Sequence, residues 1–116
     1  MLMRRNRRQY LQLREDARAL VRTRLAHFNT FYNHPVGRLS IKNHKSRWGS
    51  CSSKGNLNFN YKIVLLPPEV ADYVIVHELC HLVEFNHSPK FWALVSKTLP
   101  DHAHLRQTLR RIERTK

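Results

Sequence analysis

The segment from His77 to His81 combines residue types and a spacing that can bind a metal ion and activate water. It has the pattern H-E-x-x-H, with Glu78 directly after the first histidine. On a helix, residues four apart are offset by about 40° and about 6 Å, so both imidazoles face the same side. Two such rings can occupy adjacent corners of a tetrahedral zinc site. Glu78 can then act on a water molecule as a general base without being a ligand.

A catalytic zinc site usually has a third protein ligand, and His87 is the first candidate. It lies about 15 Å beyond His77 along a continuous helix, so the helix must end and the chain must turn back. Asn86 tolerates the left-handed conformation common at helix ends, and Ser88-Pro89 is a suitable start for a new helix. A turn is therefore predicted where the site needs one.

Three other residues compete for the third ligand position. Glu84 lies on the same helix face as the motif histidines, but one turn too far along the axis. Its side chain is better placed to hydrogen-bond a ligand imidazole. His102 and His104 are expected at the surface or at a helix start. A metal-free interpretation is weaker, because two histidines and a glutamate in an apolar core helix destabilise the fold unless something pairs them.

The hydrophobic pattern predicts the elements that position these residues. Apolar residues at spacings of three and four predict a helix from Gln9 to about Asn33, ended by Pro35 and Gly37. Alternating apolar and polar residues between positions 38 and 64 predict about three short strands. Lys54-Gly55-Asn56 is the expected turn between two of them. We expect these strands to form a small antiparallel sheet.

The motif falls in a predicted helix that begins at Pro67-Pro68-Glu69 and runs to about Glu84 or Phe85. This helix is apolar on most sides and belongs in the core. Two C-terminal helices are expected after it, one from Ser88-Pro89 and one after Asp101. The predicted fold class is therefore α+β, with an N-terminal helix, the small sheet, the motif helix and two further helices.

Length and composition predict one domain over residues 1–116. No segment is long and apolar enough to span a bilayer, and no apolar stretch of about 7–15 residues follows the basic start, as a signal peptide requires. The cysteines, Cys51 and Cys80, are too few for a disulfide framework. These features predict a cytoplasmic protein with no membrane partner. They leave the oligomeric state open.

The charge balance suggests a second function class. The net charge is +13, with 21 Lys and Arg against 8 Asp and Glu, and such a surface attracts polyanions such as nucleic acid. Arg14, Arg18 and Arg22 form a stripe at helical spacing, for which a solvated face is the simpler explanation. The alternative function is a basic nucleic-acid-associated binding module with a structural or vestigial zinc site. Structural zinc sites, however, normally have four ligands and favour cysteine.

Further residues around the motif match a known pattern: Ser46-Arg47-Trp48-Gly49-Ser50-Cys51-Ser52, Pro67-Pro68, Asp72-Tyr73-Val74, His77-Glu78-Leu79-Cys80-His81-Leu82, Asn86-His87-Ser88 and Phe91-Trp92. Over roughly residues 38 to 100 the chain thus resembles the YgjP-like metallopeptidase family, a relative of the SprT-like zinc proteases. The resemblance implies a minimal zincin-like fold, zinc bound by His77, His81 and His87, and catalysis by Glu78. Longer members carry an N-terminal β-rich region that this sequence lacks, which affects the expected substrate range.

The predicted activity is that of a zinc-dependent hydrolase acting on a peptide or protein substrate. In this hypothesis Glu78 accepts a proton from the attacking water and returns it to the leaving amine. We expect an edge strand holding Asn58 and Asn60 to align an extended peptide, which makes these two residues the candidate substrate-binding positions. The residue that stabilises the oxyanion is not determined by the sequence; the candidates are Arg47, Tyr61 and Tyr73.

Overall fold

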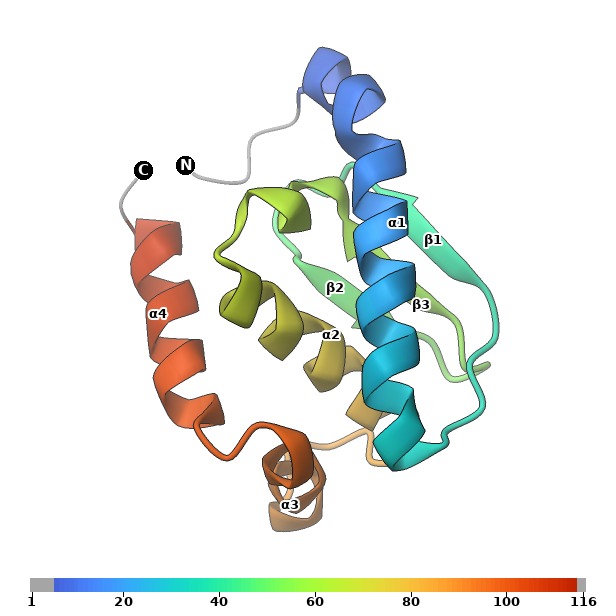
Figure 1. Cartoon of the computed structure of the whole chain (residues 1–116), viewed down its shortest axis with the longest axis vertical. Coiled ribbons are helices and arrows are strands. Elements are labelled where there is room, and N and C mark those ends of the chain that lie inside the picture. Colours follow the sequence, from blue (N-terminus) through green and yellow to red (C-terminus); the bar gives the residue numbers. More distant parts are fainter. Residues whose placement is uncertain (1–5, 115–116) are drawn as a thin grey trace.

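The computed structural model describes residues 6–114, which form four α-helices, three short strands and one 3-10 helix (Figure 1). In chain order these elements are α1 (Arg7–Tyr32), β1 (Leu39–Lys42), β2 (Gly49–Cys51), β3 (Leu57–Asn60), η1 (Tyr61–Leu65), α2 (Pro68–His81), α3 (Pro89–Thr98) and α4 (His102–Arg114). The fold class is therefore α+β, and the predicted order of helices and strands is confirmed.

Helix α1 covers one side of the molecule with a single apolar face. The side chain of Asn6 caps its start by accepting a hydrogen bond from the backbone N–H of Gln9. The helix ends at Tyr32 and is capped by Asn33, whose φ of 55° is left-handed and whose N–H donates to the carbonyl of Asn29. Its buried residues follow the predicted helical spacing: Ala17, Val21, Leu25, Phe28 and Tyr32.

The sheet is mixed, and the prediction of an antiparallel sheet is wrong for one of its two pairings. The strand order is β1-β3-β2, with β2 antiparallel and β1 parallel to the central β3. After β1 the chain crosses the end of β3 before β2 returns along the far edge, so β1 and β3 run in the same direction. Asn60 holds this crossing by donating to the carbonyls of His44 and Arg47, at 2.9 and 3.0 Å.

Helix α2 is the central element of the core and contacts α1, α3, α4 and β2 (Figure 1). It begins at Pro68 with Glu69 in its first turn, as predicted. It ends at His81, earlier than the predicted Glu84 or Phe85, because the chain tightens there: the N–H groups of Leu82 and Val83 donate to carbonyls three residues back, those of Leu79 and Cys80. This early end decides where the following loop goes.

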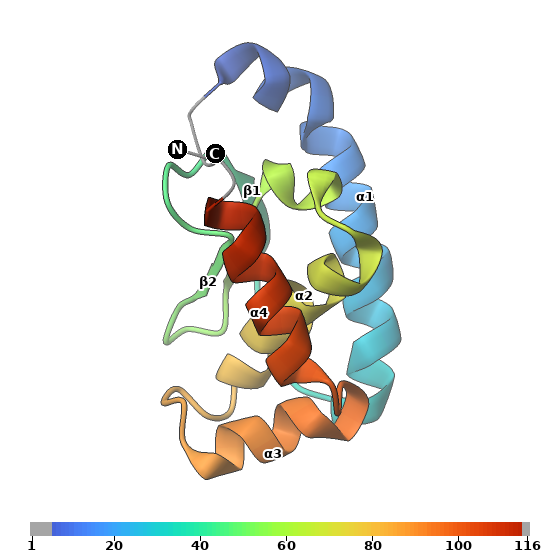
Figure 2. The same cartoon turned by 90° about the vertical axis from the view of Figure 1, so that its left-hand side faces the viewer.

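Helices α3 and α4 complete the molecule. Figure 2 shows α3 across the lower end of the molecule and α4 alongside α2. The hydroxyl of Ser88 caps α3 by accepting from the N–H of Phe91, and Phe91 and Val95 are its buried residues. Leu105 anchors α4 in the core. None of the helices within residues 6–114 combines the length and hydropathy that crossing a bilayer requires.

Candidate metal centre

Three histidine side chains meet at the C-terminal end of α2. His77 and His81 lie one turn apart on that helix, and His87 lies in the loop before α3. Their Nε2 atoms are 3.1 Å apart for His77 and His81, 2.9 Å for His81 and His87, and 3.2 Å for His77 and His87. Across residues 6–114, these three form the one group of potential ligands close enough to share a metal ion.

The spacing of the three nitrogens fits a tetrahedral metal site. Nitrogens about 2.0–2.1 Å from a zinc ion at tetrahedral corners are about 3.3–3.4 Å from each other. The observed separations of 2.9 to 3.2 Å are slightly shorter. Mutual hydrogen bonds are a poor alternative, because a neutral imidazole carries only one N–H.

The second ring nitrogen of His81 has a defined role. Its Nδ1 lies 3.0 Å from the backbone carbonyl oxygen of Glu84, and since a carbonyl only accepts, Nδ1 donates. This tautomer leaves a lone pair on Nε2, the atom that faces the other two rings. Glu84 thus supports a candidate ligand through its backbone carbonyl, rather than through the carboxylate that its position on the helix face predicts. The buried Nδ1 of His77 has no such partner within the described chain.

An aromatic wall encloses the histidines from the α3 side. Phe91 is fully buried, and its ring centroid lies 4.5 to 5.1 Å from those of all three histidines. Trp92 lies 5.8 Å from His87 and 6.1 Å from His77. These rings exclude water from one side of the cluster. The sequence pattern identified Phe91 and Trp92 only through the family resemblance, although their position four and five residues after His87 was a signal for this contact.

The side chain of Glu78 extends from α2 to Gly49 of β2, and the residue is 8% exposed. A Cβ atom at Gly49 of β2 would lie 2.9 Å from the Cγ atom and 3.3 Å from the Oε2 atom of Glu78. A side chain at position 49 would therefore displace the glutamate. The carboxylate itself forms no hydrogen bond or ion pair with another group of residues 6–114. It is held by packing and stays available to a ligand.

Burial shifts the protonation of both kinds of group in this cluster. It lowers the pKa of His77 to about 3, with smaller contributions from the neighbouring His81 and His87 and from Arg106. The pKa of His81 is also lowered, again mainly by burial. Burial raises the pKa of Glu78 to about 7, against the opposing charge of Arg47. Neutral imidazoles are the form that binds a metal ion, and a carboxyl with a pKa near 7 exchanges protons at neutral pH.

Two open hollows include Gly49 and Glu78 in their lining. The first has a volume of about 210 Å³, lies between β2, α2 and α4, and includes Trp48, Tyr73, His77 and Glu78 in its lining. The second has a volume of about 300 Å³ and is lined by Arg47, Gly49, Cys51, Glu78, His81 and Phe85. A substrate can therefore approach the glutamate and the histidines along β2.

The candidate substrate-binding residues Asn58 and Asn60 lie on β3. That strand is central and paired on both sides, so the expectation that it is an edge strand able to align a peptide is wrong. The side chain of Asn60 is fully buried and holds the crossing loop, while Asn58 donates to the hydroxyl of Ser50 at 3.3 Å. The edge strand beside Glu78 is β2, which sequence alternation alone could not distinguish from β3.

The other sequence candidates are spread over the molecule. The hydroxyl of Tyr61 donates to Gln9 at 2.7 Å, next to α1 and away from the histidines. Tyr73 and Arg47 each line one of the two hollows beside Glu78. His102 stacks on Trp92 at 5.0 Å and, like His104, lies outside the three-histidine group.

A small α+β fold in which one helix and the following loop bring three histidines together beside a buried glutamate is the architecture of a metallopeptidase. The chain belongs to the YgjP-like family: the family model described as "YgjP-like, metallopeptidase domain" matches residues 4–112. Membership implies a divalent metal ion, typically zinc, to which the three imidazole nitrogens are suited.

Solved structures agree with this assignment. The chain is similar to the metallopeptidase zymogen of Pyrococcus abyssi abylysin, at 27% identity and a TM-score of 0.69, over 77% of this chain and 90% of that one. The fold is also shared with the metallopeptidase zymogen of Methanocaldococcus jannaschii jannalysin, at 24% identity and a TM-score of 0.64, over 82% and 94% of the two chains. No curated protein matches the sequence.

Proposed function

We propose that this metallopeptidase is a zinc-dependent enzyme that cleaves peptide bonds, with His77, His81 and His87 as the metal ligands and Glu78 as the general base. The observation that carries the proposal is the convergence of three Nε2 atoms within 3.2 Å of one another, next to a buried carboxylate with no internal partner. We take the whole chain to act as one domain in the cytoplasm, as its composition predicts.

The chemistry follows from these groups. His77, His81 and His87 would hold the zinc ion, which would supply polarisation of the substrate carbonyl and a water molecule whose pKa is lowered toward about 7. Glu78 would accept the proton of the attacking water and later donate it to the leaving amine. Gly49 leaves the space in which this carboxylate sits. Tyr73 and Arg47 are the nearest candidates for stabilising the oxyanion, since each lines a hollow that reaches Glu78.

Substrate alignment is proposed for β2. This strand lies at the sheet edge and against α2, so one side of its backbone is not paired within the sheet. An extended peptide can add to such an edge through backbone hydrogen bonds. Contact of Asn58 with substrate stays a prediction. Asn60 has no exposed surface with which to make one.

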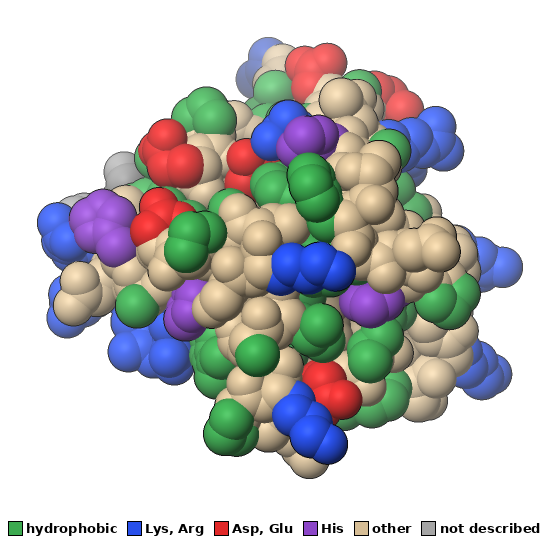
Figure 3. Space-filling model, turned by 60° about the horizontal axis from the view of Figure 1, so that its bottom comes forward, with side chains coloured by type: hydrophobic (Ala, Val, Ile, Leu, Met, Phe, Trp, Pro, Cys, Tyr) green, Lys and Arg blue, Asp and Glu red, His purple; other side chains and the backbone are tan. Residues whose placement is uncertain are grey.

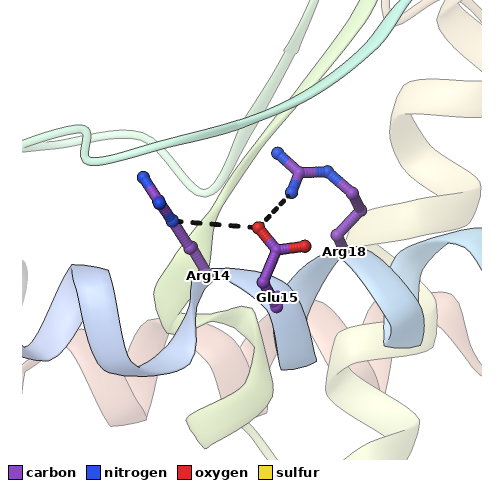
Figure 4. A network of polar contacts seen from close by, with 3 residues as sticks. All are labelled: Arg14, Glu15 and Arg18. Carbon is purple, nitrogen blue, oxygen red and sulfur yellow. Dashed lines mark hydrogen bonds and ion pairs between the residues drawn. The ribbon is translucent and has the colours of Figure 1, made fainter.

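A nucleic-acid-binding module is the weaker candidate. Arg14 and Arg18 of the arginine stripe turn toward the carboxylate of Glu15, at 3.8 and 2.7 Å (Figure 4). On the face that Figure 3 presents, lysine and arginine side chains are separated by hydrophobic, acidic and histidine side chains. Nucleic-acid association therefore stays a prediction from the net charge of +13.

The proposal is tested by separating metal binding from hydrolysis. Elemental analysis should find zinc in the purified wild-type chain and an equal amount in Glu78→Gln, because the glutamate is not a ligand. Hydrolysis of an unfolded protein such as casein should fall by about 10²- to 10⁴-fold in Glu78→Gln. Glu69→Gln, an exposed acid in the first turn of the same helix, is the matched control and should retain full activity. Wild-type protein without zinc affinity, or equal hydrolysis by Glu78→Gln, would contradict the proposal.

A further inference from the structure

Two arginines of α4 face the proposed catalytic site. Arg106 and Arg110 are one helical turn apart, so they share a face. Both line the hollow of about 210 Å³ that contains His77 and Glu78. Both also line a neighbouring hollow of about 340 Å³, formed with Trp92, His102, Ala103 and Gln107. The pair thus forms a common wall of two adjoining hollows, which gives it direct access to anything bound there.

Arg106 also lies close to the proposed metal ligands. The Cζ atom of Arg106 lies 5.5 Å from the centroid of a Trp92 ring, and this side chain in turn neighbours His77 and His87. Positive charge is therefore placed within a few side chains of the proposed reaction centre.

Neither arginine has an acidic partner within residues 6–114. The carboxylate of Glu113 lines the same hollow, but it accepts a hydrogen bond from the indole of Trp48 at 2.8 Å. By contrast, Arg24 of α1 is bound to Asp72. A guanidinium binds a carboxylate with two parallel hydrogen bonds, and such pairs are stronger and more specific than a lysine contact. Arg106 and Arg110 therefore remain able to bind the carboxylate of a ligand.

We propose that Arg106 and Arg110 form a carboxylate-binding subsite that gives the enzyme a preference for acidic substrates. This inference rests on the proposed function and names the substrate chemistry of the same site. The carboxylate comes either from an Asp or Glu side chain near the cleaved bond or from the C-terminus of the peptide. A basic side chain in the same place is repelled by the two guanidinium groups. The net charge of +13 assists by attracting acidic peptides to the surface.

The test measures binding without hydrolysis. Zinc-loaded Glu78→Gln is titrated into dye-labelled alanine-rich peptides by fluorescence anisotropy. One peptide carries a central Glu with both termini blocked, the second has Gln in its place, and the third has Gln with a free C-terminal carboxylate. We expect the first or third peptide to bind about tenfold more tightly than the second, as a charge-assisted pair allows. Tighter binding of the first identifies a side-chain carboxylate; tighter binding of the third identifies the C-terminus.

Two double variants separate the subsite from the general charge. Arg106→Gln with Arg110→Gln should abolish the discrimination between peptides. Arg111→Gln with Arg114→Gln removes the same charge from exposed positions of the same helix that line neither hollow, and should retain it. Thermal unfolding of each variant checks the fold. Equal binding of all three peptides, or an equal loss in both double variants, would overturn the inference.

Hydrolysis by the wild-type chain distinguishes this inference from the function on which it rests. If wild type cleaves all three peptides with equal kcat/KM and binds them equally, the peptidase stands and the carboxylate subsite is wrong. If wild type cleaves nothing but the discrimination in binding persists and depends on Arg106 and Arg110, the carboxylate subsite stands and the catalytic proposal fails.

Discussion

The two ends of α2 differ in whether their polar side chains have hydrogen-bond partners inside the protein. Near its start, Asp72 accepts two hydrogen bonds from Arg24 of α1, at 2.8 and 2.9 Å, so both groups have a partner inside the protein. Near its end, Glu78 has no polar partner among the described residues, and the Nε2 atoms of His77 and His81 face only each other and His87. Both ends lie in the same fold and on the same helix.

This difference separates structural from functional polar groups. Burying a polar group is unfavourable unless a hydrogen bond compensates, and at the start of α2 the compensation is internal. At the end of α2 the compensating interaction must come from a bound ligand. Changes at the first end should therefore alter stability, while changes at the second should alter metal binding and catalysis. Five variants, four single and one double, test this contrast, with expected effects that decrease from the first to the last.

His81→Ala should have the largest effect. Loss of a residue that merely supports a ligand lowers metal affinity by about 10- to 100-fold, so loss of a ligand should exceed about 100-fold. Competition with a chelating dye measures the zinc affinity. His104→Ala removes an exposed histidine of α4 and should bind zinc as wild type does. Equal zinc affinity in the two variants would place the metal elsewhere.

Gly49→Ala should lower activity while leaving zinc bound. The added Cβ displaces Glu78, and a misplacement of about 1 Å can lower a rate by about 100-fold. The measurement is kcat/KM for peptide cleavage, together with zinc content. Ala substitution at Ser50, the next residue of β2, serves as the control. An active Gly49→Ala enzyme would show that the glutamate does not need its present position.

Asn60→Ala should destabilise the fold by about 1–3 kcal/mol, because it removes three hydrogen bonds made by a fully buried side chain. The side chain now satisfies the carbonyls of His44 and Arg47 and the N–H of Lys62. Denaturant unfolding gives the change in free energy. Asn58→Ala, which loses a single bond of 3.3 Å, should have a clearly smaller effect. Equal losses would mean that the crossing loop is not held by Asn60.

Asp72→Asn should lower stability by about 1 kcal/mol, since the pair is partly exposed and screened by solvent. The hydrogen bonds to Asp72 are also the main reason why the pKa of Arg24 is raised. Zinc affinity should stay unchanged, because the pair stands at the far end of α2. The loss should shrink at high salt. A loss of zinc affinity would break the proposed separation between the two ends of the helix.

The double change of Arg14→Gln and Arg18→Gln should have the smallest effect, within about 0.5 kcal/mol of wild type. Both arginines share one exposed carboxylate, that of Glu15. Thermal unfolding measures the stability, and binding of a labelled nucleic acid at physiological salt measures the competing function. A large loss of nucleic-acid affinity would revive the binding-module hypothesis for this face.

Much of the fold could be predicted because its signals are local. The apolar spacing of α1, the prolines that begin α2 and α3, and the glycine turn before β3 depend on residues close together in the chain. The sheet order could not be predicted this way. Which strand is central depends on the path of the loop between β1 and β2, and that path is held by Asn60 from a later strand.

In the candidate site, too, the local features could be predicted from the sequence and the contacts between distant segments could not. The sequence alone determined that His77, Glu78 and His81 share one helix, since helical geometry places residues four apart on one face. It also required a turn before His87 could join them. Only the tertiary structure decided that Gly49 makes room for Glu78, and that Arg106 and Arg110 of α4 face the hollow that contains Glu78. Such contacts join segments far apart in the chain, whose meeting is set by packing rather than by spacing.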